Sequence, residues 1–238
     1  MKKGLIIISF LIISTTLFAQ IRDVSILNGK AIEDSLFNSN MFFLKEFADS
    51  KITMNDGTIY SAKANISSIA QAVVVIGDRG DTLGFLKESD IAIFSGGGIV
   101  ASKVNGVYHQ ILSISKDFFL GKTRKIDLRT RRPRGAYGGS THTSSVDELS
   151  HIAVGGAGEV MRIINEDWSR GDIIELEYEY EEELFIISNG RRYVPTKRNF
   201  EKFFSKQKNE ISDYVKENKT NFSKRDDVIG LFLYLVQS

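Results

Sequence analysis

Three short turn signals from residue 51 onward, each Asp or Asn followed by Gly, constrain the fold of this chain more than any other feature; they stand at 56–57, 105–106 and 189–190. Each pair lies between two short runs that are rich in β-branched and aromatic residues. Glycine accepts the positive φ of a tight turn, so this arrangement favours β-hairpins. From residue 51 onward the sequence therefore predicts a meander of antiparallel strands.

Two of the strand-like runs differ in their hydrophobic pattern. Residues 73–76 are all apolar, which predicts a strand that is covered on both faces and placed centrally in its sheet. By contrast, Leu176, Tyr178 and Tyr180 alternate with glutamates, which predicts a strand with one apolar face and one solvated face.

After residue 195 the hydrophobic period becomes helical, although Ser205 can divide the first helical run in two. A final helix is predicted to begin near Ser223 as N-cap, with Asp226 in its first turn. That helix is apolar almost all round, so we expect it to be buried. Its apolar stripe consists of Val228, Leu231, Phe232 and Leu235, and Ile229, Leu233 and Val236 make much of the other side apolar too.

These patterns predict an α+β fold that is mainly β. We expect an antiparallel meander that curls into a small sandwich or open barrel, with a helical C-terminal segment docked on the sheet. The β-rich region is expected over residues 20–195, with a flexible Gly/Ser/Thr loop near 133–150, and the helical segment over 196–238.

The first residues, "MKKGLIIISFLIISTTLFAQ", have two lysines, a short apolar run and small residues up to Ala19. This layout is typical of a secretory signal peptide over residues 1–19, and its apolar run is too short for a membrane span. The chain has no cysteine, so Cys-linked lipid anchors, disulfides and thiolate chemistry are excluded. We therefore expect an exported protein, periplasmic or at the cell surface, that is not a lipoprotein.

The charge balance gives no general attraction to nucleic acid. Without Lys2 and Lys3 the 31 basic residues become 29, against 30 acidic residues. A protein that binds nucleic acid through phosphates needs a continuous basic surface, which such a balance does not predict. No nucleic-acid partner is expected.

The charges are nevertheless concentrated in two runs. Residues 122–134 contain seven basic residues and one acid, whereas residues 172–183 contain seven acids and no base. The simpler interpretation is that the two runs pair in one sheet or form solvated faces, with cross-strand pairs of about 0.2–1 kcal/mol each. The alternative hypothesis is an edge that binds an anion or a partner, such as an anionic glycan or lipid head group, through Arg129, Arg131, Arg132 and Arg134.

Motifs for cofactors and metals are incomplete. Gly121-Lys122-Thr123 lacks the glycine of a phosphate-binding loop, since Lys116 stands there, and the glycines at 96–98 and 155–158 lack dinucleotide-binding spacing. Glu148 and His151 form one copy of a metal-binding spacing that needs more ligands. We expect no metal and no cofactor.

Two smaller features have structural interpretations. The tripeptide Arg79-Gly80-Asp81 matches an integrin-binding motif, but Gly80 is well explained as a turn residue. His109 alternates within a predicted strand, and we expect it to be a structural or surface residue.

Several segments together resemble a group of uncharacterised exported proteins of Gram-negative bacteria. They include "ITMNDGTIYSAKANIS", "GAYGG", "FIISNGRRYVPTKRNFEKFF" and "ISDYVKENKTNFSKRDDVIGLFLYL". Members of the group join a signal peptide, a β-rich region with a "DG" hairpin and a helical C-terminus. The resemblance implies an envelope location and brings no catalytic residue.

The function predicted from these observations is that of an exported, non-enzymatic envelope protein that binds an envelope component or a partner protein. The expected contact surface is a sheet edge near Arg129–Arg134. The alternative is a hydrolase that acts on envelope polymers through two carboxylates about 5–10 Å apart. Candidates for that pair include Glu166, Asp167 and Glu175.

Overall fold

The computed structural model describes residues 21–27, 30–78, 80, 82–85, 88–130 and 174–238. Its large sheet contains β3 (Ala48–Met54), β4 (Ile59–Ser67), β5 (Ala72–Ile76), β6 (Thr82–Gly84), β7 (Ile91–Gly96), β8 (Ile99–Val104), β9 (Val107–Ile114), β10 (Phe119–Thr123), β13 (Leu184–Ser188) and β14 (Arg191–Tyr193). A small sheet contains β1 (Ile21–Leu27), β2 (Lys30–Ala31), β11 (Lys125–Thr130) and β12 (Ile174–Glu181). The helices are α1 (Ser35–Asn40), the 3-10 turn η1 (Glu88–Asp90), α3 (Lys197–Phe203), α4 (Lys208–Glu217) and α5 (Arg225–Gln237).

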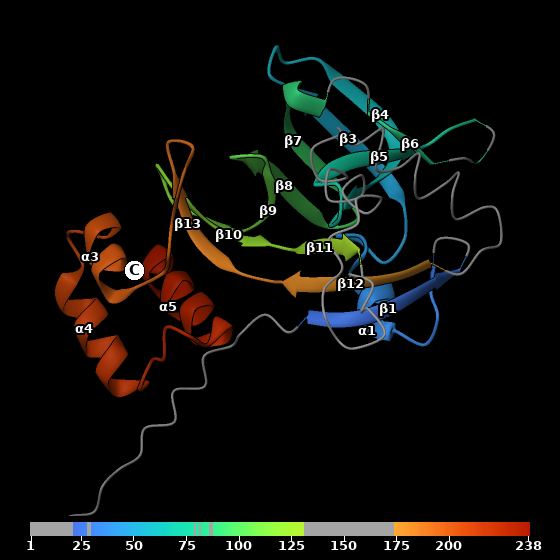
Figure 1. Ribbon diagram of the computed structural model, residues 1–238. Coiled ribbons are helices and arrows are strands. Elements are labelled where there is room, and N and C mark those ends of the chain that lie inside the picture. Colours follow the sequence, from blue (N-terminus) through green and yellow to red (C-terminus); the bar gives the residue numbers. More distant parts are fainter. Residues whose placement is uncertain (1–20, 28–29, 79, 81, 86–87, 131–173) are drawn as a thin grey trace, which may run out of the picture.

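Both sheets are antiparallel, and Figure 1 shows the helical C-terminal segment at one end of the large sheet. The strand order is β14-β13-β10-β9-β8-β7-β3-β4-β5-β6 in the large sheet and β11-β12-β1-β2 in the small one. The predicted β-rich antiparallel fold with a helical C-terminal segment is confirmed.

The three predicted hairpins form at the predicted turns. Asn105 and Gly106 both have positive φ, 51° and 79°, as do Asn189 and Gly190 at 49° and 70°. These are the angles that two-residue hairpin turns require. The β3–β4 loop, residues 55–58, is longer, with Met54 N–H bonded to the carbonyl of Thr58 at 2.8 Å and Gly57 at φ 86°.

The middle of the large sheet curls around its own core without closing into a barrel. Gln71 Oε1 accepts the N–H of Tyr108 at 2.9 Å, and Glu88 Oε2 accepts the N–H of Val73 at 3.0 Å. These side chains bridge β5 and β9, which are five positions apart in the strand order. The enclosed core consists of Phe43, Ile52, Met54, Ala64, Ile66, Val73, Ile91, Phe94, Ala101 and Tyr108.

This curl corrects the prediction that residues 73–76 form a central strand. β5 lies next to the edge strand β6, and only its first three residues, Ala72, Val73 and Val74, are buried. Their burial comes from the curvature of the sheet, which brings the far strands over β5, and not from a central position.

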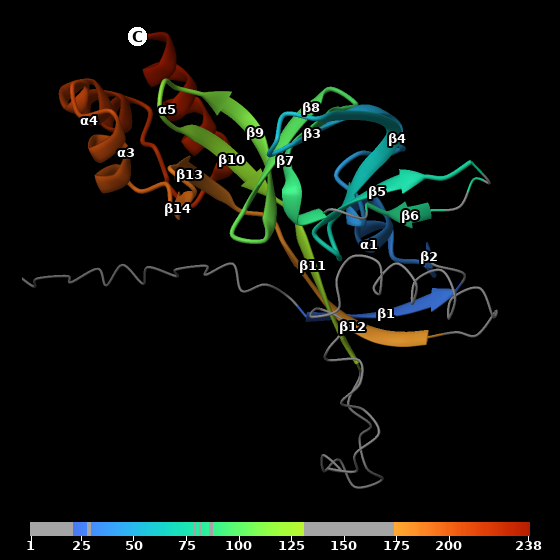
Figure 2. The same cartoon turned by 90° about the horizontal axis from the view of Figure 1, so that it is seen from above.

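A long two-stranded ribbon connects the two sheets. β10 and β11 follow each other in sequence, as do β12 and β13, and the two pairs keep one register from Phe119↔Ile187 to Thr130↔Leu176. Between the sheets the ribbon is continued by the bond from Thr123 N–H to the carbonyl of Glu183 at 2.8 Å. Figure 2 shows this ribbon crossing from the large sheet to the small one.

The C-terminal helices pack on one face of the large sheet at the end of the ribbon. Their shared core consists of Leu120, Leu184, Ile186, Phe200, Phe204, Ile211, Val228, Leu231, Phe232 and Leu235. The first helical run is divided, because α3 ends at Phe203 and α4 begins at Lys208, on either side of Ser205. Within the described residues, no helix has the length and apolarity needed to cross a membrane.

The predicted docking of α5 through the stripe of Val228, Leu231, Phe232 and Leu235 is confirmed, but two details are wrong. Its N-cap is Lys224, which makes no side-chain capping bond, and not Ser223. Only one stripe of α5 is buried, whereas Leu233 and Val236 remain exposed. Among the described residues, the helix has a packing layer on one side only, so a continuous apolar surface does not lead to complete burial.

Candidate functional site

One face of the ribbon is apolar at both ends and charged in the middle. Leu120 belongs to the helical core, and Ile126 belongs to the core of the small sheet. Lys122 and Arg124 lie between them at alternate positions, which places both on this same face. On the opposite strand Glu182 holds the corresponding place, between Tyr180 and Leu184.

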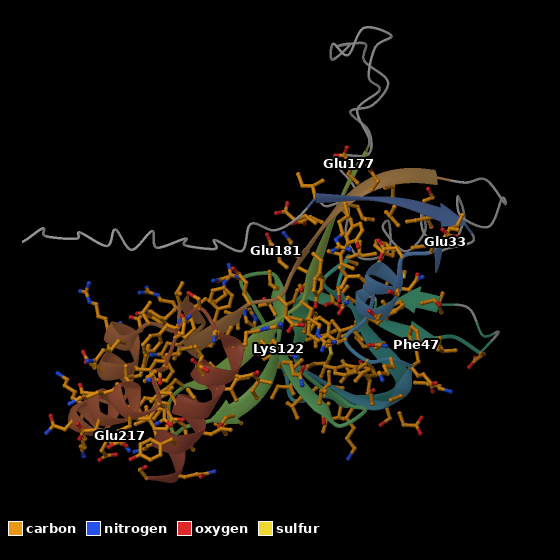
Figure 3. The ribbon with its side chains drawn as sticks, turned by 90° about the horizontal axis from the view of Figure 1, so that it is seen from below. Glu33, Phe47, Lys122, Glu177, Glu181 and Glu217 are labelled. Atoms are coloured by element: carbon orange, nitrogen blue, oxygen red, sulfur yellow. The ribbon has the colours of Figure 1, made fainter. Side chains whose placement is uncertain are left out.

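The carboxylate of Glu182 gathers four side chains. Arg124 Nε donates to Oε2 at 3.2 Å, and Tyr180 Oη donates to the same oxygen at 2.7 Å. Arg225, the first residue of α5, pairs with Oε1, and Lys122 Nζ lies 4.0 Å from Oε1. We call these five residues the Glu182 cluster; in Figure 3 Lys122 lies where the helices meet the two sheets.

The Glu182 cluster is unbalanced in charge. It holds three cations and one carboxylate, and the side chains of Glu182 and Lys122 are only 14% and 18% exposed. Burial, followed by the charges of Arg124 and Arg225, lowers the pKa of Lys122 below its ordinary 10.5. Burial also raises the pKa of Tyr180, so its hydroxyl stays protonated and donates to Glu182. The arrangement has the charge and the donors to bind an anion.

A second enclosed carboxylate, Glu88, has balanced partners. Its Oε1 accepts from Tyr108 Oη at 2.7 Å and from Lys103 Nζ at 3.1 Å, and its Oε2 accepts from Val73 N–H. Burial raises the pKa of Glu88, while Tyr108 and Lys103 act in the opposite direction. With one cation for one anion, this group holds the curl of the large sheet together.

His109 is fully buried in β9, so of the two roles expected from the sequence, structural or surface, the structural role is confirmed. Its Nδ1 lies 2.9 Å from the carbonyl of Val107, which can only accept, so Nδ1 carries the proton. Burial is the main cause that lowers the pKa of His109 to about 4, so the ring is neutral at neutral pH. Nε2 has no hydrogen bond from any residue in the described part of the chain.

The basic and acidic runs pair in the ribbon, which is one of the two alternatives that the sequence left open. β11 pairs with β12 so that Lys125 lies opposite Glu181 and Arg129 opposite Glu177. The basic run is nevertheless divided, because Lys122 belongs to β10 in the large sheet.

β11 is an edge strand of the small sheet. Ile126 N–H points away from β12 and donates to the carbonyl of Ser68 at 3.0 Å. Because backbone groups alternate along a strand, the N–H of Leu128 points the same way. No residue in the described ranges accepts from it.

Of the four predicted arginines, three lie outside the described residues, so their grouping stays a prediction. Arg129 lies in β11, whereas Arg131, Arg132 and Arg134 are outside the described residues. The incomplete metal-binding spacing at 148 and 151 and the predicted loop near 133–150 are outside them as well.

The other sequence candidates can be placed only in part. Of the candidate hydrolase carboxylates, Glu166 and Asp167 are outside the described residues, and Glu175 lies in β12 opposite Ser25. Gly80 has φ 81° and donates its N–H to the carbonyl of Gly77 at 2.9 Å, which confirms its turn role.

Sequence reasoning missed Glu182 and Arg225. A signal for Glu182 was present, because it follows Tyr178 and Tyr180 in the same alternation and precedes Leu184, on a face that is otherwise apolar. A charged residue at a position that the alternation assigns to the buried face indicates an ion-pair or hydrogen-bond partner, because charges are rarely placed on a buried face without partners. Arg225 had no comparable signal, because it is one of many basic residues near a helix start.

Comparison of the chain with protein-family models, curated proteins and solved structures gives no match. Within the described residues, no group of three or more His, Cys, Asp or Glu side chains is placed to hold a metal ion.

Proposed function

We propose that this protein is an exported, non-enzymatic protein of the cell envelope that binds a partner protein along the edge of β11. The observation that carries the proposal is the outward-pointing backbone of β11 at Leu128. Unpaired strand edges bind extended segments of other chains by adding a strand to the sheet. The signal-peptide pattern and the resemblance to exported proteins support the location.

The residues along and after this edge favour an acidic partner segment. Arg129 lies in β11, and Arg131, Arg132 and Arg134 follow it directly in the sequence. Charge complementarity speeds association and helps to set the register of the added strand. The backbone bonds supply affinity, and the arginines supply selectivity.

The experiment that tests this function replaces Leu128 by proline. Proline removes the outward N–H and is tolerated at such an edge position, so pairing with β12 is kept. Leu128→Ala is the matched control, because it removes the same half-buried side chain and keeps the N–H. Each purified protein would be cross-linked to components of its own cell envelope, and the captured partner would be identified.

The expected result is one partner that the native chain and Leu128→Ala capture and Leu128→Pro does not. Replacement of Arg129, Arg131, Arg132 and Arg134 by alanine should weaken that capture. Capture of the same partner by Leu128→Pro, or no specific capture by the native chain, would overturn the proposal.

A further inference from the structure

The Glu182 cluster contains three cations for one carboxylate, two more than the balanced pair at Glu88. Glu182 Oε2 accepts from Arg124 Nε and Tyr180 Oη, and Oε1 pairs with Arg225. Lys122 Nζ, at 4.0 Å, is beyond hydrogen-bond distance, and no residue in the described ranges bonds to it. Charges removed from water are unfavourable unless they are paired. Lys122 is therefore the least completely paired of the three cations.

Two of the three cations, Lys122 and Arg124, come from one face of the ribbon, and the third comes from the start of α5. Lys122 lies in β10, which pairs with β9 on one side and β13 on the other. Arg124 is fixed by a second bond, from Nη1 to the carbonyl of Phe43 at 3.1 Å. Arg225 begins α5, a helix anchored in the core, although its own side chain is 54% exposed. The positions of Lys122 and Arg124 are therefore set by packed structure, which lowers the cost of ordering these two side chains around a ligand.

The acids nearest in sequence to Arg225 do not neutralise this surplus. Asp226 and Asp227 lie in the first turn of α5, and Asp227 Oδ2 accepts the N–H of Asn221 at 2.7 Å. In the described part of the chain, neither acid forms an ion pair with the three cations.

The surplus charge and its geometry define a class of ligand. A phosphate or sulfate group presents several acceptor oxygens in different directions, and its negative charge offsets the surplus. Arginine and lysine are the usual donors to such groups. We propose that the Glu182 cluster binds a tetrahedral oxyanion, a phosphate or sulfate group, through Lys122, Arg124 and Arg225. This site is separate from the edge of β11.

The first test measures binding of inorganic phosphate and sulfate by calorimetry. We expect both anions to bind the native protein, and Lys122→Met to reduce the affinity at least about tenfold, as loss of a charge-assisted bond implies. Lys125→Met is the matched control, because Lys125 lies on the other face of the same ribbon and pairs with Asp127 at 2.6 Å. Its phosphate affinity should remain unchanged.

Thermal unfolding separates a binding site from a structural ion network. In phosphate-free buffer, Lys122→Met should have a higher Tm than the native protein, because an incompletely paired cation is removed. Added phosphate should raise the Tm of the native protein and of Lys125→Met, but not that of Lys122→Met. A lower Tm for Lys122→Met without anions, or equal phosphate effects in all three proteins, would overturn the proposal.

Vesicles distinguish the two sources of the anion. Vesicles of phosphatidylglycerol and of phosphatidylcholine would be sedimented with the native protein, Lys122→Met and Lys125→Met. Sedimentation with phosphatidylglycerol that Lys122→Met abolishes identifies a lipid head group. Binding of inorganic phosphate without vesicle binding identifies a soluble phosphate or sulfate compound. If neither anions nor vesicles bind in a way that depends on Lys122, the proposal is wrong.

Discussion

Glu88 and Glu182 are enclosed to the same degree, with side chains 16% and 14% exposed, yet their surroundings differ in charge. Glu88 has one cation, one hydroxyl and one backbone N–H. Glu182 has three cations and one hydroxyl. Because each partner of Glu88 is engaged by its carboxylate, that network is complete within the chain. The surplus at Glu182 indicates a group that receives its last partner from outside.

The largest effect is expected from Glu88→Ala. The substitution leaves the ammonium of Lys103, the hydroxyl of Tyr108 and the N–H of Val73 without their acceptor, and it removes a bridge across the curled sheet. We expect a loss of about 3 kcal/mol in the free energy of unfolding, measured with urea. Ser89→Ala, at an exposed neighbour, is the control, and a loss for Glu88→Ala below about 1 kcal/mol would contradict the structural role.

Glu182→Gln should have the next largest effect. It leaves Lys122, Arg124 and Arg225 without a carboxylate, so we expect a loss of about 2 kcal/mol at low salt. Added phosphate should restore part of this loss, whereas it should not help Glu88→Ala. If sodium chloride at matched ionic strength restores the same amount of stability to Glu182→Gln, the effect of phosphate is general charge screening. The predicted difference between the Glu182 and Glu88 networks would then be wrong.

The two lysines should respond with opposite signs. Lys103→Met removes the cation partner of Glu88 and should decrease the free energy of unfolding by about 1 kcal/mol. Lys122→Met removes an incompletely paired cation and should increase it by about 0.5 kcal/mol in phosphate-free buffer. Urea titrations of both variants under identical conditions test this prediction. If both substitutions change the free energy of unfolding in the same direction, the proposed difference between the two networks is wrong.

The smallest effect is expected in the pH dependence of stability. Because the pKa of Glu88 is raised from 4.5 in the folded state, protonation of Glu88 contributes to the free energy of unfolding. This contribution is fully present below about pH 4.5 and is lost as the pH rises through the folded-state pKa. Because the pKa of Lys122 is lowered from 10.5 in the folded state, deprotonation of Lys122 contributes to the free energy of unfolding. This contribution is present above pH 10.5 and is lost as the pH falls through the folded-state pKa. Stability curves of Glu88→Gln and Lys122→Met should differ from the native curve in these separate windows. A shared window would show that the two groups are coupled.

Local patterns were the most reliable guide to the fold. The turns at 105–106 and 189–190 form where predicted, because positive φ is a property of the residues themselves. The alternation in β12 also predicts the buried face correctly, since Leu176 and Tyr178 are buried. The central position of residues 73–76 was wrong, because an apolar run reports burial and does not say which strands provide it.

The sequence by itself determined the hairpins, the faces of β12 and the division between α3 and α4, since each depends on residues a few positions apart. Only the tertiary structure decided the curl of the large sheet, the passage of the ribbon between two sheets and the meeting of Glu182 with Arg225. These features join residues that are distant in the chain: Lys122 and Arg225 meet because β10 and α5 pack in one core. Periodicity predicts which side of an element is buried, whereas the identity of its neighbour depends on the packing of the whole chain.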